Sequence, residues 1–198
     1  MDDLSEILSE LLQAVGDHLT AEGCEASIVV VGGASLNLLG MIERATHDVD
    51  VIARASGISG LGPVDLHPGQ PLPEALSRAV RKVARDYALR EDWLNAEVSS
   101  QWSQGLPPTL PQDIEWRRFG ALDVGLVGRR TLIALKLFAA ADRGPRSVHL
   151  QDLRELAPTQ EELKEAEDWV LTQDASPLFP RMVTGVIEHV RSTPSGSG

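Results

Sequence analysis

The sequence predicts an α/β fold, in which a small mixed sheet is flanked by helices and followed by a helical C-terminal subdomain. Short runs rich in β-branched residues alternate with segments whose apolar residues recur at helical spacing. Beyond about residue 129 only the helical spacing continues. A chain of 198 residues, with 42% apolar and 24% charged residues, is long enough to bury a core of this kind.

Each element is predicted from its own local pattern. The first helix has leucines, isoleucine and valine on one face and acids on the other, and Gly23 ends it. Helices are expected at residues 3–20, 34–39, 74–89 and 131–141, with three more between 148 and 191. Strands are expected near 28–32, 48–53, 114–119 and 121–127, the last two as a hairpin turned at Gly120. The Gly-, Pro- and Ser-rich residues 56–73 are predicted to form a loop.

These elements group into three parts of the chain. We expect an α/β core with its N-terminal helix at 1–128, a helical subdomain at 129–191 and a disordered tail at 192–198. The single cysteine, Cys24, fits a reducing compartment. No apolar run approaches the roughly 20 residues that a bilayer crossing needs. The expectation is a cytoplasmic protein without a membrane partner.

The charge distribution limits the partners. A net charge of −11 argues against a sequence-blind nucleic-acid binder that works by phosphate neutralisation alone. Arginine and lysine nevertheless outnumber acids between residues 114 and 150. That part of the chain can face an anionic ligand, although an ordinary solvated surface is an equally good interpretation.

A glycine pair follows the first predicted strand. Gly32 and Gly33 lead into a helix that begins with Ala34 and Ser35. Without Cβ atoms at the glycines a triphosphate can approach the backbone, where the first N–H groups of the helix and the Ser35 hydroxyl can donate to it. The same pair is also common as simple turn chemistry.

Two aspartates lie on the next predicted strand. Asp48 and Asp50 flank Val49, so their side chains share one face, with Cα atoms roughly 7 Å apart. Two carboxylates this close repel each other, and a cation between them removes that repulsion. Mg²⁺ suits the position, because it prefers carboxylate, water and phosphate oxygens. Solvated or arginine-paired carboxylates are the ordinary alternative.

The glycine turn and the Asp pair together, in this order, describe a metal-assisted phosphoryl or nucleotidyl transfer site. Other Asp-x-Asp chemistries fit less well. A haloacid-dehalogenase-type phosphatase needs its Asp at the end of an apolar strand, whereas the polar residues 43–47 precede Asp48. A sugar-nucleotide glycosyltransferase needs a long nucleotide-binding half before its motif, and only 47 residues precede this one.

Gly32-Gly33-Ala34-Ser35, followed by Arg44-Ala45-Thr46-His47-Asp48-Val49-Asp50, resembles the signature of the DNA-polymerase-β-like nucleotidyltransferase superfamily. The Arg-x-Thr-x-Asp-hydrophobic-Asp form is similar to its minimal prokaryotic branch, which includes the abortive-infection type IV toxins and related uncharacterised nucleotidyltransferases. Two later helices also resemble that branch, so the likeness spans roughly residues 28–156.

The resemblance implies roles for most of the motif residues. Asp48 and Asp50 would be ligands of Mg²⁺ or Mn²⁺, and Gly32, Gly33 and Ser35 would form the cradle of a nucleoside triphosphate. Arg44 and Thr46 would brace the strand that carries the aspartates or touch phosphate.

The resemblance extends to three further residues. Lys136, in Leu-x-x-x-Lys-Leu-x-Ala, would contact a nucleotide phosphate, and Asp152 would be a late acidic member of the site. Enzymes of this superfamily normally add a third carboxylate from a neighbouring strand. Asp123 has the local context for it, and a solvated edge-strand aspartate is the alternative.

The expected function is Mg²⁺-dependent transfer of a nucleoside monophosphate from a nucleoside triphosphate to an acceptor hydroxyl of RNA, such as tRNA, or of protein. The resemblance adds the possibility of a toxin with a cognate antitoxin as partner. A catalytically inactive module that binds nucleotide or a partner protein is the alternative. An α/β interaction domain without a nucleotide site is a third.

Overall fold

The structure is a computed structural model that describes residues 4–42, 46, 48–57, 64–144 and 147–192. The chain divides into two compact units. Unit 1 comprises residues 1–104 and 114–127, and unit 2 comprises residues 105–113 and 128–198. The aspartate pair of the sequence motif lies in unit 1, whereas Lys136 and Asp152 lie in unit 2.

Residues 105–113 depart from the predicted division, which assigned them to the N-terminal part. Asp113 binds this segment to the start of α4 (Arg129–Arg143). Its carboxylate accepts the N–H of Thr131 at 2.8 Å, and its carbonyl oxygen accepts the N–H of Gly128 at 2.6 Å. A helix leaves its first N–H groups without internal partners, so these bonds complete the start of α4. The segment, with the 3-10 helix η2 (Leu110–Gln112), therefore folds with unit 2.

Unit 1 contains a mixed sheet, which confirms the predicted fold class. Its strands are β1 (Ala26–Val31), β2 (Val49–Ser56), β3 (Asp65–Pro68), β4 (Leu94–Asn95), β5 (Ile114–Phe119) and β6 (Leu122–Val127). The order is β3-β2-β1-β6-β5, with β4 also paired to β2. The pairs β1–β6 and β2–β4 are parallel, and the other pairs are antiparallel. The hairpin predicted at Gly120 is confirmed, with Gly120 at a φ of +57°.

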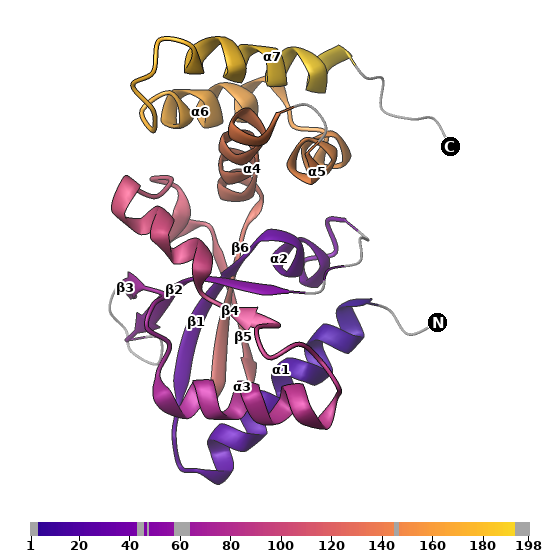
Figure 1. The fold of residues 1–198 in the computed structure, drawn as a ribbon, viewed down its shortest axis with the longest axis vertical. Coiled ribbons are helices and arrows are strands. Elements are labelled where there is room, and N and C mark those ends of the chain that lie inside the picture. The colour runs from indigo at the N-terminus through magenta and orange to yellow at the C-terminus, as the bar shows by residue number, and fades with distance from the viewer. Residues whose placement is uncertain (1–3, 43–45, 47, 58–63, 145–146, 193–198) are drawn as a thin grey trace. The chain divides into compact units, whose positions relative to one another are not determined.

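The helices α1 (Leu4–Ala21) and α3 (Glu74–Asp86) pack together on one face of this sheet (Figure 1). Their apolar residues meet alternate residues of the strands in one core, which includes Leu12, Val80, Val49 and Val51. The short helix α2 (Gly32–Leu38) follows β1 directly. Because side chains alternate along a strand, Asp50 faces away from this core.

Two short strands fall outside the sequence prediction. β3 lies within residues 56–73, for which the sequence predicts a loop, and β4 has no counterpart among the predicted strands. β3 is mostly exposed, ends on Pro68 and adds to the edge of the sheet, so it has no alternation of apolar and polar residues to reveal it. β4 has two residues and exists through its pairing with β2, about 45 residues earlier in the chain.

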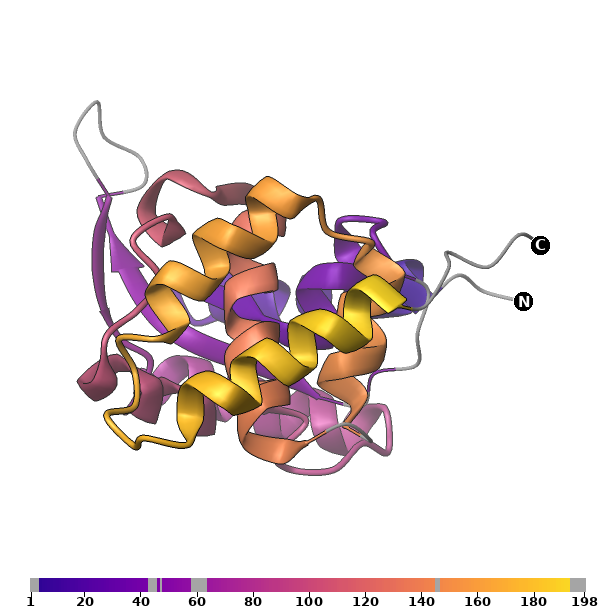
Figure 2. The same ribbon diagram turned by 90° about the horizontal axis from the view of Figure 1, so that it is seen from above.

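Unit 2 is helical, with α4 followed by α5 (Val148–Leu156), α6 (Gln160–Val170) and α7 (Phe179–Ser192). The helices α6 and α7 lie against α4 (Figure 2). Arg129, at the start of α4, links this helix to α6 and to the end of α5. Its guanidinium donates to Glu162 at 2.7 Å and to the Leu156 carbonyl at 2.7 Å. None of the helices in the described part of the chain has the length and hydrophobicity of a membrane span.

Candidate functional site

The glycine turn at the end of β1 has a backbone conformation that favours glycine. Gly32 has a φ of +73°, in the left-handed region that other residues rarely adopt. A Cβ atom at Gly32 would lie 3.0 Å from Oδ2 of Asp50, which is tighter than nearly all real Cβ contacts. The glycine therefore lets the carboxylate of Asp50 approach the backbone of the turn.

The register of β1 and β2 explains why Gly32 and Asp50 meet. Val31 is the partner of Asp50 in this antiparallel pair, so the residue after Val31 lies beside the aspartate. Val49 and Val51, on either side of Asp50, are buried in the core. The apolar neighbours hold the strand in place and turn the half-buried Asp50 to the other face.

Asp48 lies immediately before β2, in a position fixed by its neighbours. The N–H of Val49 donates to the Trp93 carbonyl at 2.6 Å, and the Thr46 hydroxyl donates to the Asp48 carbonyl at 3.1 Å. The Asp48 side chain is 41% exposed, yet its Oδ1 atom is buried and has no hydrogen-bond partner among the described residues. A buried carboxylate oxygen in this condition favours a cation beside it.

The cation nearest to this oxygen among the described residues is Arg90, whose Nη1 lies 3.8 Å from Oδ1 of Asp48. Asp92 holds the guanidinium by two hydrogen bonds, of 2.9 Å from Nε and 2.5 Å from Nη2. The hydrogen bond and charge of Asp92, followed by the charge of Asp48, raise the pKa of Arg90 above its usual value. The same hydrogen bond lowers the pKa of Asp92. Arg90 is thus a fixed positive charge at the edge of the aspartate site.

Asn95 is a second residue beside the aspartates that the sequence did not reveal as functional. It is the partner of Asp50 in the parallel β2–β4 pair, and paired residues share a face of the sheet. Its Oδ1 accepts the N–H of Glu97 at 3.0 Å. The neighbour of Asp50 on this strand is therefore an amide and not a third carboxylate. Trp93-Leu94-Asn95 resembles the uncharacterised members of the nucleotidyltransferase branch, but that likeness gives Asn95 no role. The β2–β4 pairing places Asn95 beside Asp50, and the 3.8 Å distance to Asp48 identifies Arg90.

The other predicted members of the triphosphate cradle have different surroundings. Ser35 is fully buried, and its hydroxyl donates to the Val127 carbonyl at 2.9 Å. Gly33 is buried at the start of α2. In this arrangement Ser35 joins α2 to β6. The predicted role of Arg44 concerns a position outside the described residues.

Asp123 lies at the far end of the sheet from Asp50. In the parallel β1–β6 pair its partner is Ser27, four residues before Val31, the partner of Asp50. Four residues of strand span about 13 Å. One metal ion, with ligands about 2 Å away, cannot bind both carboxylates. Oδ1 of Asp123 instead lies 3.8 Å from Nη1 of Arg118, and we leave Asp123 out of the site.

Lys136 and Asp152 pair with one another inside unit 2. Nζ of Lys136 lies 2.5 Å from Oδ2 of Asp152, and the two residues are only 5% and 0% exposed. A lysine that contacts a nucleotide phosphate needs an accessible ammonium group. The observed burial gives this pair a structural role between α4 and α5, and we leave both residues out of the site.

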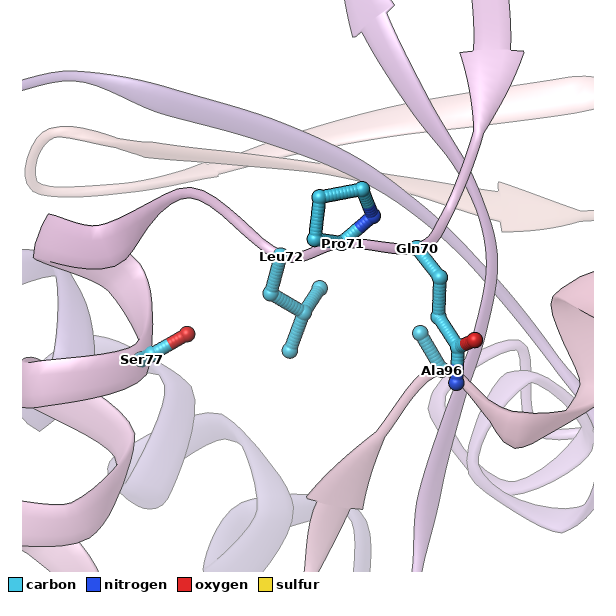
Figure 3. A pocket seen from close by; sticks show the side chains of 5 residues that line it. All are labelled: Gln70, Pro71, Leu72, Ser77 and Ala96. Atoms are coloured by element: carbon cyan, nitrogen blue, oxygen red, sulfur yellow. The ribbon is translucent and has the colours of Figure 1, made fainter.

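A surface hollow of about 520 Å³ lies near the site but does not belong to it (Figure 3). It is lined by Gln70, Pro71, Leu72, Ser77 and Ala96. Ala96 belongs to the core, and Leu72 packs against it, on the face that α1 and α3 cover. Asp50 faces the opposite side of the sheet. The hollow and the aspartates are therefore separated by the strands.

Among the described residues, no group of three or more His, Cys, Asp or Glu side chains could hold a metal ion. The candidate site is thus built from two carboxylates, Asp48 and Asp50, beside Gly32, with Arg90 and Asn95 at its edge. Two carboxylates with water and phosphate oxygens are a common way for a protein to bind Mg²⁺.

Comparison with known protein families gives one match that covers this site. Residues 3–100 match the family described as "Nucleotidyltransferase of unknown function (DUF6036)". The matched region contains Gly32, Asp48 and Asp50, as well as Arg90 and Asn95. Comparison with curated proteins and with solved structures finds no match. The predicted relationship to nucleotidyltransferases is confirmed for residues 3–100, which match a family of nucleotidyltransferases of unknown function.

Proposed function

We propose that unit 1 binds a nucleoside triphosphate together with Mg²⁺, and transfers the nucleoside monophosphate to a hydroxyl group of an RNA or protein acceptor. The observation that carries this proposal is the meeting of Gly32 and Asp50, with a Cβ-free backbone against a carboxylate that faces away from the core. The family match to nucleotidyltransferases supports it.

The residues present fit a hard divalent cation. Asp48 Oδ1 is a buried oxygen without a hydrogen-bond partner in the described part of the chain, and the Asp50 carboxylate lies two residues further along. Carboxylate oxygens are the ligands that Mg²⁺ prefers, with its remaining positions taken by water and phosphate. Bound Mg²⁺ would polarise the phosphate oxygens and stabilise the negative charge that develops during transfer.

The chain's own residues would position the reactants. Asp48 and Asp50 would each present an oxygen to the metal, and the Gly32 turn would leave room for the phosphates. As the acceptor oxygen bonds to the α-phosphorus, the bond to pyrophosphate breaks and the acceptor proton is released to water. Because the carboxylate oxygens of Asp48 and Asp50 have fixed positions, a bound triphosphate would be oriented correctly for this displacement.

A second function, nucleotide binding without transfer, is favoured by one observation. Asn95 occupies the strand position beside Asp50, and an amide can neither remove a proton from the acceptor nor add a negative charge. A module of this kind would bind nucleotide with the same two aspartates and release it unchanged.

Incubation with each nucleoside triphosphate, labelled at the α-phosphate, separates the two functions. In the presence of Mg²⁺ and cellular RNA, we expect label on RNA or on protein, and loss of that label in Asp50→Asn. Asp65→Asn is the matched control, because Asp65 lies exposed at the other end of β2, opposite Ser56. Nucleotide binding without label transfer would support the binding module. Equal transfer by Asp50→Asn would contradict the proposed site.

A further inference from the structure

Two oppositely charged groups at the edge of the aspartate site lie opposite each other without a hydrogen bond between them. Oδ1 of Asp48 accepts no hydrogen bond, and Nη1 of Arg90 donates none, within the part of the chain that the structure describes. The two atoms are 3.8 Å apart, which is too far for a hydrogen bond. An anionic hydrogen-bond acceptor and a cationic hydrogen-bond donor therefore lie close together, and each can still bond to a ligand.

Asp92 determines how the guanidinium is presented. It engages Nε and Nη2 through both of its oxygens, and leaves the Nη1 side directed toward Asp48. The Arg90 side chain is 66% exposed, so a ligand can reach it. A guanidinium that is held on one edge and open on the other is well suited to a phosphate oxygen.

The spacing matches a phosphate that shares a metal ion with Asp48. In an octahedral Mg²⁺ site with ligands at about 2.0–2.1 Å, neighbouring ligand oxygens lie about 2.9 Å apart. A phosphate oxygen next to Asp48 Oδ1 would therefore be about 2.9 Å from it. Nη1, at 3.8 Å from the same Oδ1, can lie at hydrogen-bond distance from that phosphate oxygen as well.

We propose that Arg90 binds a phosphate oxygen of the nucleotide through Nη1, next to the metal ion held by Asp48, and that Asp92 is the residue that positions it. This inference rests on the proposed function, because it needs a nucleotide at the aspartates. It adds a cationic contact to the polyphosphate site, besides the one that the sequence motif predicts for Arg44. A guanidinium stays protonated throughout the physiological range, so the contact is available at any physiological pH.

The test is calorimetric titration of the full chain with Mn²⁺ alone, with Mn²⁺ and the tightest-binding nucleoside triphosphate, and with Mn²⁺ and inorganic tripolyphosphate. In Arg90→Gln we expect the affinities for the nucleotide and for tripolyphosphate to fall by about tenfold or more, as for loss of a hydrogen bond to a charged group. Binding of Mn²⁺ alone should not weaken, because the arginine does not bind the metal. Arg85→Gln, in the last turn of α3, is the control, since Arg85 is also exposed.

Asp92→Asn tests the positioning role. We expect a smaller loss of polyphosphate affinity, and no further loss when Asp92→Asn is combined with Arg90→Gln, because Asp92 acts through the arginine. Losses that add in the double variant would overturn that role.

Two results would overturn the contact itself. One is wild-type affinity in Arg90→Gln, and the other is a loss for the nucleotide but not for tripolyphosphate. If the wild-type protein binds no nucleotide with Mn²⁺, the proposed function fails and this inference fails with it. Wild-type binding that Arg90→Gln leaves intact overturns only the inference.

Discussion

Gly32 and Asp50 lie so close that a single methyl group would disturb both. The turn has a φ of +73°, and the nearest atom to a Cβ at this position is Oδ2 of Asp50, at 3.0 Å. The closeness follows from the β1–β2 register, which makes Val31 the partner of Asp50. A residue of the glycine turn and a candidate metal ligand therefore lie in close contact.

Gly32→Ala should weaken Mg²⁺-dependent nucleotide binding by about tenfold and destabilise the protein by about 1–2 kcal/mol. The methyl group displaces the Asp50 carboxylate by a few tenths of an ångström, and the positive φ adds strain. Gly40→Ala isolates the strain, because Gly40 has a φ of +65° and a methyl group there would have no neighbour within 4 Å. Calorimetric titration and urea unfolding measure the two effects. Equal losses of affinity in both variants would contradict crowding of Asp50.

Gly16→Ala should destabilise the protein by about 3 kcal/mol. A Cβ at Gly16 would lie 1.7 Å from the Phe119 carbonyl oxygen, so α1 would have to move away from the β5–β6 hairpin. Gly185→Ala, inside α7 with nothing near its Cβ position, should instead stabilise by about 1 kcal/mol through helix propensity. Urea unfolding followed by circular dichroism compares them. A stable Gly16→Ala protein would mean that α1 packs less closely than described.

Lys136→Met should cost about 3–5 kcal/mol of stability, because it removes the ammonium group that pairs with a buried carboxylate. Replacing both residues, in Lys136→Met with Asp152→Leu, should cost clearly less, since neither charge then remains. Denaturant unfolding of the three proteins measures the difference. A double variant as unstable as the single one would argue against the ion pair as the reason for the cost.

The pair of Arg129 and Glu162 should make stability depend on pH in the acid range. The hydrogen bond from Arg129, with a further contribution from the Thr159 N–H, lowers the pKa of Glu162 below its ordinary value of 4.5. The folded protein therefore binds this proton less tightly than the unfolded chain. The stabilisation is present above about pH 4.5 and is lost as the pH falls toward the lowered pKa.

Glu162→Gln provides the test of that pH dependence. The variant should be less stable than the wild type at pH 7, and the difference should shrink as the pH is lowered below about 4.5. Thermal unfolding from about pH 7 to about pH 3 measures it. A difference that grows toward acid pH would have the wrong sign.

Much of the site could be predicted from the sequence, because its parts have local patterns. A β-branched run before Gly32, and aspartates alternating with Val49, identify a strand, a turn and a second strand without any knowledge of contacts. The glycine turn and the aspartates come together once these two neighbouring strands pair antiparallel. The helices were predicted for the same reason, since their apolar periodicity lies within each segment.

The residues that depend on distant pairing could not be predicted. The context of Asp123 is that of a strand aspartate, but the parallel alignment of β6 with β1, which no local pattern encodes, places it about 13 Å along the sheet from Asp50. Lys136 has the same appearance in an apolar helix whether it meets a phosphate or Asp152. Arg90 and Asn95 reach the aspartates only because β4 pairs with β2.

Titration of the full chain with the tightest-binding nucleoside triphosphate, with and without Mg²⁺, tests the central claim most directly. The account predicts metal-dependent binding that Asp50→Asn weakens by at least about tenfold, and that Asp123→Asn leaves unchanged because that carboxylate lies at the other end of the sheet. Equal binding in wild type and Asp50→Asn, or binding that is independent of metal, would contradict it.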